Sequence, residues 1–429
     1  MHLKKRTENN SISKYISKHV GPGFITGAAD DDPSGIFTYS QTGALFGLSQ
    51  LWTAIFSYPF MVVIQEMCGR IGLVTGRGLA GVIKTHYSKY ILFFTVSLLV
   101  IANAINIGAD LGAMAASLQL LVNLPFLILL LAITSFTIFV EVLVPYPIYS
   151  KFLKYLTFSL LAYVCTAFII KQDWVLVLRS TLTPHIEFTK EYILNIAAIL
   201  GTTISPYLFF WQADEEVEEE IVAHKILSIG EGVPNIEEAD IKKMRVDTYF
   251  GMFFSNLISF FIILTAASTL GISGFKNIDS LSEAASALRP LAGDFAFLLF
   301  TFGIFGTGLL AVPVLAGSAA YAISESLNWN AGLGKKFSQA YGFYAVIILA
   351  TLMGLIVNFL SISPVTMLYY TSVLNGVMAP PLMILILFIA NNKKVLGSYT
   401  NSAISNIFGS IITIVMSAIS LSLLVSLFV

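Results

Sequence analysis

Three consecutive aspartates, Asp30, Asp31 and Asp32, lie in an otherwise apolar stretch of the sequence and are followed directly by Pro33. A carboxylate is a hard oxygen ligand that suits cations such as Mg²⁺ and Mn²⁺. In apolar surroundings an ionised carboxylate is costly unless a positive charge or a proton neutralises it. The proline directly after Asp32 interrupts any helix there, because it removes a backbone donor and clashes with the preceding turn. Asp32 is therefore a candidate cation ligand at a helix break, and Asp31 is a second candidate.

The composition places these acids in a membrane protein. Of 429 residues, 56% are hydrophobic and only 11% are charged, against roughly 25% charged residues in ordinary soluble domains. A formal net charge of −1 argues against a nucleic-acid partner. Cys68 and Cys165 lie far apart and match no metal-binding spacing. Residues 1–20 are polar and basic, without the apolar core of a signal peptide, and are predicted to form a cytoplasmic tail.

About 20 apolar residues are needed to cross the hydrocarbon core, and the sequence offers eleven such stretches. They are predicted at 22–47, 50–70, 91–121, 124–145, 150–170, 191–213, 247–272, 291–324, 339–361, 365–390 and 403–428. Spans of this length are helices, so the predicted fold is an all-α integral membrane protein. With the N-terminus inside, the outer segments hold five of the 24 Lys and Arg residues, namely Lys171, Arg179, Lys190, Lys276 and Arg289. This excess of inner basic residues predicts a cell-membrane protein with a cytoplasmic N-terminus.

The first and sixth spans are both interrupted. The first contains DDDPSG, and the sixth reads AAILGTTISPYLFFWQADEE, in which Gly201, Thr202, Thr203, Ser205 and Pro206 cluster near mid-membrane. Broken helices at matching positions of two halves indicate an inverted-repeat transporter with its site at the midplane. We therefore predict one transmembrane domain over 21–429: repeat one at about 21–170, repeat two at about 191–390, and an extra helix at about 403–428. Two ordinary proline kinks are the simpler alternative.

An ionised residue at the bilayer centre costs on the order of 2.5–3.5 kcal/mol on insertion scales. We therefore expect Asp32 alone at the midplane, with Asp30 and Asp31 facing water or capping a half-helix. Apart from Arg70, Lys151 and Lys154 at the ends of two spans, the predicted spans contain no Lys or Arg, and none is placed to pair with Asp32. Either a metal cation from outside or a bound proton would neutralise it. The acidic run DEEVEEE at 214–220 is interpreted as a solvated extension of the sixth helix rather than a metal site, and Glu66 and Arg70 as an interfacial i,i+4 pair.

Four segments together resemble the Nramp family of divalent-metal transporters: GPGFITGAADDDPSG at 21–35, LFGLSQLW at 45–52, IGLVTGRGLAGVI at 71–83 and GTGLLAVPVLAGSAAYA at 306–322. The resemblance covers almost the whole chain. It implies a LeuT-type fold of 5+5 helices, in which a metal ion is held between the unwound first and sixth helices and moved by alternating access.

The resemblance also implies a set of ligands, and this sequence departs from it. Typical members read Asp-Pro-Gly-Asn in the first helix, so Asp32 is kept and Gly35 replaces the asparagine. Thr202 stands at the position whose carbonyl binds the metal. Ser205 replaces the methionine before the proline, although its hydroxyl could instead bond its own backbone.

The positions around that ligand set change as well. Tyr207 and Gln212 stand where the family has two histidines in the sixth helix. Asp110 is retained in the third helix, but Ala113 replaces its acidic partner, and the arginine of the ninth helix is absent. Asn375 matches a polar residue of the tenth helix. Gln212 and Asn375 are equally compatible with interhelical hydrogen bonds.

These departures favour a hard, hydrated ion. A thioether favours transition metals over magnesium, and its loss removes that selection. Mg²⁺ keeps several waters when bound, for which small residues at Gly35 and Ser205 would leave room, and hydroxyls of Thr202, Thr203, Ser205 and Tyr207 could hold them. We therefore expect a transporter for Mg²⁺, and also Mn²⁺, like the Nramp-related magnesium transporters. Without the histidines and the arginine that form the family's proton route, we expect no proton coupling.

Three alternatives stay open. A proton-coupled Mn²⁺/Fe²⁺ importer of the same family would need the missing methionine and histidines. An amino-acid permease of the same fold would hold a carboxylate, which three aspartates would repel. A membrane enzyme is not favoured, because the spans contain no recognisable catalytic set. The expected partners are the divalent ion and the lipid bilayer, with no obligate protein partner and no cofactor besides the transported ion.

Overall fold

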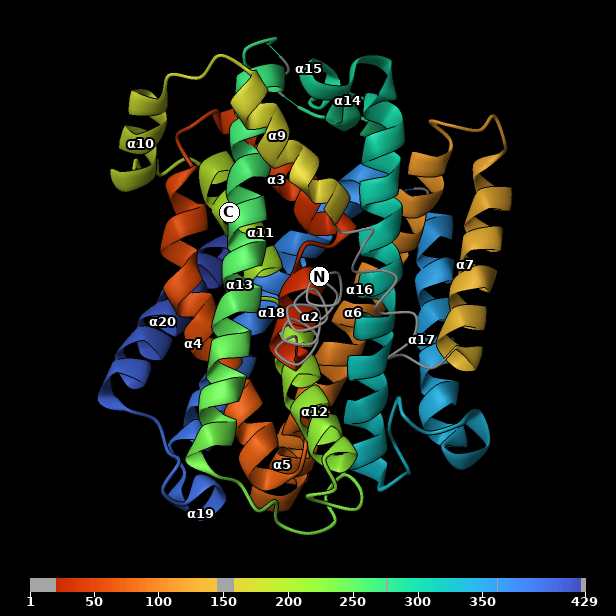
Figure 1. The fold of residues 1–429 in the computed structure, drawn as a ribbon, viewed down its shortest axis with the longest axis vertical. Coiled ribbons are helices and arrows are strands. Elements are labelled where there is room, and N and C mark those ends of the chain that lie inside the picture. The colour runs from red at the N-terminus through yellow and green to blue at the C-terminus, as the bar shows by residue number, and fades with distance from the viewer. Residues whose placement is uncertain (1–20, 145–157, 275–276, 361, 426–429) are drawn as a thin grey trace, which may run out of the picture.

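The computed structural model describes residues 21–144, 158–274, 277–360 and 362–425. Apart from one isolated bridge between Ser228 and Glu231, the regular structure in these ranges is helical. The long helices run roughly along the long axis of the molecule (Figure 1). By length and composition, eight helical stretches of the described residues could cross a membrane, and one of them, Lys190–Val222, comprises α11 and α12 together. The predicted all-α architecture is thus confirmed, while the N-terminal tail lies outside the described residues.

The first half of the chain contains the first interrupted helix. The α-helices of this first half are α2 (Pro22–Asp30), α3 (Pro33–Phe46), α4 (Trp52–Thr75), α5 (Leu79–His86), α6 (Lys89–Leu118), α7 (Phe126–Leu143), α9 (Leu161–Ile169) and α10 (Trp174–Leu182). The first interrupted helix consists of α2 and α3.

The second half contains the other interrupted helix and the final span. Its helices are α11 (Lys190–Thr203), α12 (Pro206–Val222), α13 (Glu238–Ala266), α14 (Leu281–Ser286), α15 (Arg289–Ala292), α16 (Ala296–Leu327), α17 (Tyr341–Val357), α18 (Pro364–Ala390), α19 (Lys393–Leu396) and α20 (Ala403–Val425). A short π-helical turn, Ala267–Gly271, follows α13 directly.

Within the described residues the helices follow the predicted spans, and the largest differences occur where polar turns extend an apolar span. The start of the fifth predicted span (150–157) and the end of the last (426–428) lie outside these residues. α4 continues to Thr75 and α13 begins at Glu238, whereas the predicted spans ended at 70 and began at 247. The first turn of α13 is held by a capping box in which Glu237 and Asp240 bond each other's backbone N–H groups. Counting apolar residues in the sequence finds the part of a helix that crosses the membrane, but it does not find the polar turns that extend the helix beyond it.

The connecting helices separate into two groups. α5 and α19 lie at the bottom of Figure 1, whereas α10, α14 and α15 lie at the top. The topology predicted from the basic residues puts the first group inside and the second outside, so the segments predicted to share a side do lie at the same end. We call the end with α5 and α19 the inner end, although its cytoplasmic orientation stays a prediction.

α2 packs very closely on α13, with backbone against backbone. A Cβ atom added to Gly23 would lie 2.5 Å from the Thr248 nitrogen. One added to Gly27 would lie 2.2 Å from the carbonyl oxygen of Gly251. Such distances leave no room for a side chain, so glycine at these positions is what permits the contact.

The interpretation of the acidic run as solvated was wrong for four of its six acids. α12 does extend through it, ending at Val222, but Asp214, Glu215, Glu216 and Glu220 are buried. The reason is packing, because the inner half of α12 contacts α4, α5 and α16. The Glu66–Arg70 pair is confirmed at 3.0 Å, but it is buried rather than interfacial.

Candidate metal site at the two helix breaks

The first break lies between α2 and α3. Asp32 has extended backbone angles (φ −69°, ψ 171°) and is the N-cap of α3, with Pro33 as the first helical residue. Its carboxylate oxygen Oδ1 accepts hydrogen bonds from the Gly35 N–H and from the Ser34 hydroxyl, both at 2.7 Å. The exposed N–H groups and positive end of a helix dipole favour a negative charge at this position. The local backbone therefore orients the Asp32 carboxylate and stabilises its ionised form.

The sixth span breaks in the same way between α11 and α12. Ile204 leaves the helix (φ −123°, ψ 64°), Ser205 is extended (φ −82°, ψ 135°), and Pro206 begins α12. The Ser205 hydroxyl turns back and donates to the carbonyl oxygens of Gly201 and Thr202, each at 2.8 Å. In this structure Ser205 thus bonds its own backbone, and the Thr202 carbonyl accepts one of those bonds.

The two breaks meet at Gly35. A Cβ atom added there would lie 3.0 Å from the Thr202 hydroxyl oxygen and 3.4 Å from Asp32 Oδ1. The structure therefore brings Asp32, Gly35 and Thr202 together, as the sequence predicted. The space that we expected beside Gly35 for water is filled here by the Thr202 hydroxyl.

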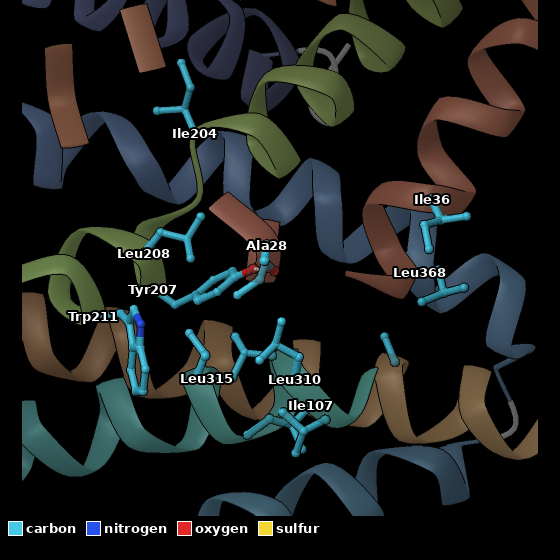
Figure 2. Close-up of a cluster of buried hydrophobic side chains, with 14 of the residues drawn as sticks. Ala28, Ile36, Ile107, Ile204, Tyr207, Leu208, Trp211, Leu310, Leu315 and Leu368 are labelled. Carbon is cyan, nitrogen blue, oxygen red and sulfur yellow. Dashed lines mark hydrogen bonds between the residues drawn. The ribbon is translucent and has the colours of Figure 1, made fainter. Parts of the chain in front are cut away.

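Tyr207 joins the two broken helices directly. It lies in the first turn of α12, and its hydroxyl donates to the Ala29 carbonyl at the end of α2, at 3.0 Å. Figure 2 shows its ring extending from α12 toward the neighbouring Ala28. Tyr207 thus links the second half of the sixth span to the end of α2 at the first break.

Asp30 and Asp31 do not face water. Both are fully enclosed, with 0% and 1% exposure. The Ser255 hydroxyl on α13 lies 2.5 Å from Asp30 Oδ2 and 3.4 Å from Asp31 Oδ1. The sequence suggested water-facing acids because burying three seemed too costly, but the close packing of α2 on α13 encloses them. Asp31 is the C-cap residue of α2, which is the other position that the sequence predicted for these acids.

Asp110 and Asn375 lie on α6 and α18, beside the broken helices. Asp110 is buried, and neither of its carboxylate oxygens has a hydrogen-bond partner. Asn375 exchanges two hydrogen bonds with Asn106, at 2.9 and 3.1 Å. Asn375 therefore joins α6 to α18 by hydrogen bonds. The Asp110 carboxylate has no such partner and could still bind a cation.

Thr203 and Gln212 are more remote from Asp32. The Thr203 hydroxyl donates to the Ile199 carbonyl at 2.7 Å and contacts the Tyr39 hydroxyl at 3.1 Å. Gln212 lies seven residues after Ser205, about 10 Å further inward along a helix, and donates to Glu216 at 2.9 Å. Gln212 is thus not at the breaks.

Three polar residues near the site were not anticipated: Ser34, Tyr39 and Ser255. Ser34 could have been found, because a hydroxyl two residues after an N-cap aspartate commonly bonds it. Tyr39 and Ser255 come from one turn further along α3 and from α13, and nothing in their local sequence distinguishes them from other polar residues of apolar helices.

The residues at the breaks offer a cation oxygen atoms: the Asp32 carboxylate, the Thr202 carbonyl and hydroxyl, and the hydroxyls of Ser205 and Tyr207. In the described part of the chain, no three His, Cys, Asp or Glu side chains converge as a metal cluster. The site therefore combines one carboxylate with neutral oxygens. Such a set suits a hard cation that keeps part of its water.

Eleven predicted spans, two of them broken at corresponding positions, define an all-α multi-pass membrane protein of the LeuT-type fold. The family model of Nramp, described as natural resistance-associated macrophage protein-like, matches residues 23–426, and the chain belongs to this family. The family's members are transporters rather than enzymes.

Two curated relatives have the same printed name, "Divalent metal cation transporter MntH". The one from Erwinia tasmaniensis is 25% identical over 417 residues, covering 95% of this chain and 94% of the relative. The one from Caldanaerobacter subterraneus is 24% identical over 409 residues, covering 94% and 91%.

Solved structures agree on the fold. A manganese transporter of Eremococcus coleocola matches with a TM-score of 0.73 at 14% identity, covering 96% of this chain and 87% of that one. The nucleobase-cation-symport-1 family transporter Mhp1 matches with a TM-score of 0.58 at 12% identity, covering 94% and 92%.

Proposed function

We propose that this protein transports Mg²⁺, and Mn²⁺ as a second substrate, across the cell membrane by alternating access. The observation that carries the proposal is the ligand chemistry where the two broken helices meet. Asp32 provides one negative charge, and Thr202, Ser205 and Tyr207 provide neutral oxygens, with no thioether or imidazole among them. Oxygen ligands are those that Mg²⁺ and Mn²⁺ share, whereas the soft ligand that would reject Mg²⁺ is missing.

The burial of the site supports alternating access. Asp32, Thr202 and Ser205 are at most 2% exposed, so a cation reaches them only after the helices move. A partly hydrated ion also needs more space than this structure leaves beside Gly35. Binding would therefore require the Thr202 hydroxyl to withdraw from Gly35, which separates the two breaks.

We also propose that transport is driven by the cation gradient and the membrane voltage without protons. Asp110 is the one member of the family's proton route that this sequence retains. Tyr207 and Gln212 replace histidines, the side chains that titrate near neutral pH. A voltage of 100 mV is worth about 2.3 kcal/mol per elementary charge, and about twice that for a dication.

A proton-coupled importer of Mn²⁺ and Fe²⁺ is the second candidate function. The names of the relatives favour it, since two are called divalent metal cation transporters and one structure is a manganese transporter. The missing methionine, histidines and arginine argue against it. An amino-acid permease is less well supported, because the aspartates of the first break would repel a carboxylate.

The test is uptake into proteoliposomes that hold the purified protein, with Mn²⁺ and Ca²⁺ as competitors and a pH-sensitive dye inside. We expect saturable Mg²⁺ uptake that Mn²⁺ inhibits, no change of internal pH, and loss of uptake in Asp32→Ala. Mn²⁺ uptake without Mg²⁺ uptake would contradict the substrate, and internal acidification that tracks uptake would contradict the lack of proton coupling.

A further inference from the structure

The three aspartates of the first break have different surroundings. Asp32 begins α3 and receives two hydrogen bonds there. Asp30 is the last residue of α2, and Asp31 follows as its C-cap. The C-terminal end of a helix carries exposed carbonyls and a partial negative charge, which disfavours an acid and favours a cation. Asp30 and Asp31 therefore lack the stabilisation that Asp32 has.

The contacts of Asp30 and Asp31 would not compensate a negative charge on either carboxylate. Ser255 donates to Asp30 Oδ2 at 2.5 Å and lies 3.4 Å from Asp31 Oδ1. Their other carboxylate oxygens, Asp30 Oδ1 and Asp31 Oδ2, are enclosed and have no hydrogen-bond partner. Within the described ranges, the salt bridges of the molecule involve other acids, such as Glu66 and Asp240. One hydroxyl cannot neutralise two buried carboxylates.

The helix packing holds this arrangement in place. Gly251 lies one turn before Ser255 on α13, and its carbonyl is the atom that Gly27 of α2 approaches. The end of α2 is thus pressed against the part of α13 that carries Ser255. Asp30 and Asp31 thus lie at the end of α2, Ser255 lies on α13, and the contact between Gly27 and Gly251 holds these two helices together.

We infer that Asp30, Asp31 and Ser255 bind a second hard cation, separate from the transported ion at Asp32. Two carboxylates and a hydroxyl offer the oxygen ligands that either Na⁺ or a divalent ion such as Mg²⁺ takes. The cation would neutralise the acids and join the end of α2 to α13. This inference goes beyond the proposed function, and it does not depend on which metal is transported.

The experiment counts the cations bound to the purified full-length protein in lipid nanodiscs. Calorimetry with Mg²⁺ in a sodium-free choline buffer is combined with equilibrium binding of radioactive Na⁺. We expect two sites per chain: two Mg²⁺ ions if the second site takes a divalent ion, or one Mg²⁺ and one Na⁺ if it takes sodium. A single cation that Asp32→Ala abolishes would overturn the inference, and would mean that Asp30 and Asp31 hold protons.

Variants assign the two sites. The double variant Asp30→Asn with Asp31→Asn is expected to lose the second cation and keep the one at Asp32. Ser255→Ala is expected to weaken the second cation about tenfold, a typical effect of losing a supporting ligand. Ser259→Ala is the matched control, because Ser259 lies one turn further along α13 and bonds the Asn256 carbonyl. Equal weakening in both serine variants would contradict the assignment.

The Asp32→Ala variant keeps the inference testable if the double variant does not fold. It should still bind one cation, and that cation should raise its melting temperature, because a ligand of the folded state stabilises it. Absence of both effects would overturn the second site. Absence of Mg²⁺ transport with two bound cations would instead contradict the proposed function alone.

Discussion

The first break carries three carboxylates and the sixth carries none, although the backbone is interrupted in the same way at both. At each break an extended residue, Asp32 or Ser205, precedes a proline that begins the next helix. At the first break the side chain caps the following helix, whereas at the sixth the hydroxyl turns back to the preceding one. The comparison shows that a helix can be interrupted in the same way with or without carboxylates at the break. One break supplies charge for a cation, and the other supplies neutral oxygens.

Removing the charge from the first break should have the largest effect. Asp32→Ala is expected to lower Mg²⁺ uptake about 100-fold or more, since a divalent ion would lose its one carboxylate at the site. Initial uptake rates in proteoliposomes measure this. Asp173→Ala, which removes an exposed cap of α10, is the control for a lost acid. Substantial uptake by Asp32→Ala would contradict the division of roles between the two breaks.

A soft ligand at the sixth break should change which ion is preferred. Ser205→Met is expected to raise the ratio of Mn²⁺ to Mg²⁺ uptake about tenfold, because a thioether interacts better with transition metals. Competition between the two ions measures the ratio, and Ser205→Ala separates the gain of sulfur from the loss of the hydroxyl. An unchanged ratio would mean that the ion does not contact this position.

The direct link between the breaks should have an intermediate effect. Tyr207→Phe removes the hydrogen bond to the Ala29 carbonyl, which is worth about 0.5–1.5 kcal/mol. We expect uptake to fall about fivefold and the folded protein to remain intact. Tyr39→Phe, which loses only a contact with Thr203, is the matched control. Equal losses in both variants would indicate a general effect of losing a buried hydroxyl.

Residues away from the breaks should matter least. Gln212→Ala removes a hydrogen bond to Glu216 about 10 Å from the break, and we expect less than a twofold change in uptake. The same uptake assay measures this change. A tenfold loss in Gln212→Ala would show that the ion's path depends on the inner half of α12.

The sequence predicted those parts of the fold and site that depend on local chemistry. Pro33 and Pro206 place both breaks together with the polar residues and glycines beside them. Proline alone would not have been enough, because Pro59 and Pro313 lie inside continuous helices. The resemblance to the family then brought Asp32, Gly35 and Thr202 together, and the structure confirms their proximity.

The rest depends on packing between distant segments. Ser255 meets Asp30 across 225 positions of the chain, and no local pattern indicates such a pair. The burial of Asp214 and Glu216 likewise follows from the helices around α12, whereas their sequence alone is typical of a solvated face. The sequence also leaves open whether Ser205 faces an ion or its own backbone, because a hydroxyl at a break can do either.

The glycine contact between α2 and α13 has a mechanical consequence. Where Gly27 meets the Gly251 carbonyl and Gly23 meets Thr248, the two backbones are in direct contact, with no room for a side chain at these points. Any movement of α2 toward α13 at these points would drive one backbone into the other. The single methyl group added by Gly27→Ala would clash with the Gly251 carbonyl and push the two helices apart. It would favour whichever state of the transport cycle separates these helices, and so could trap that state for structure determination.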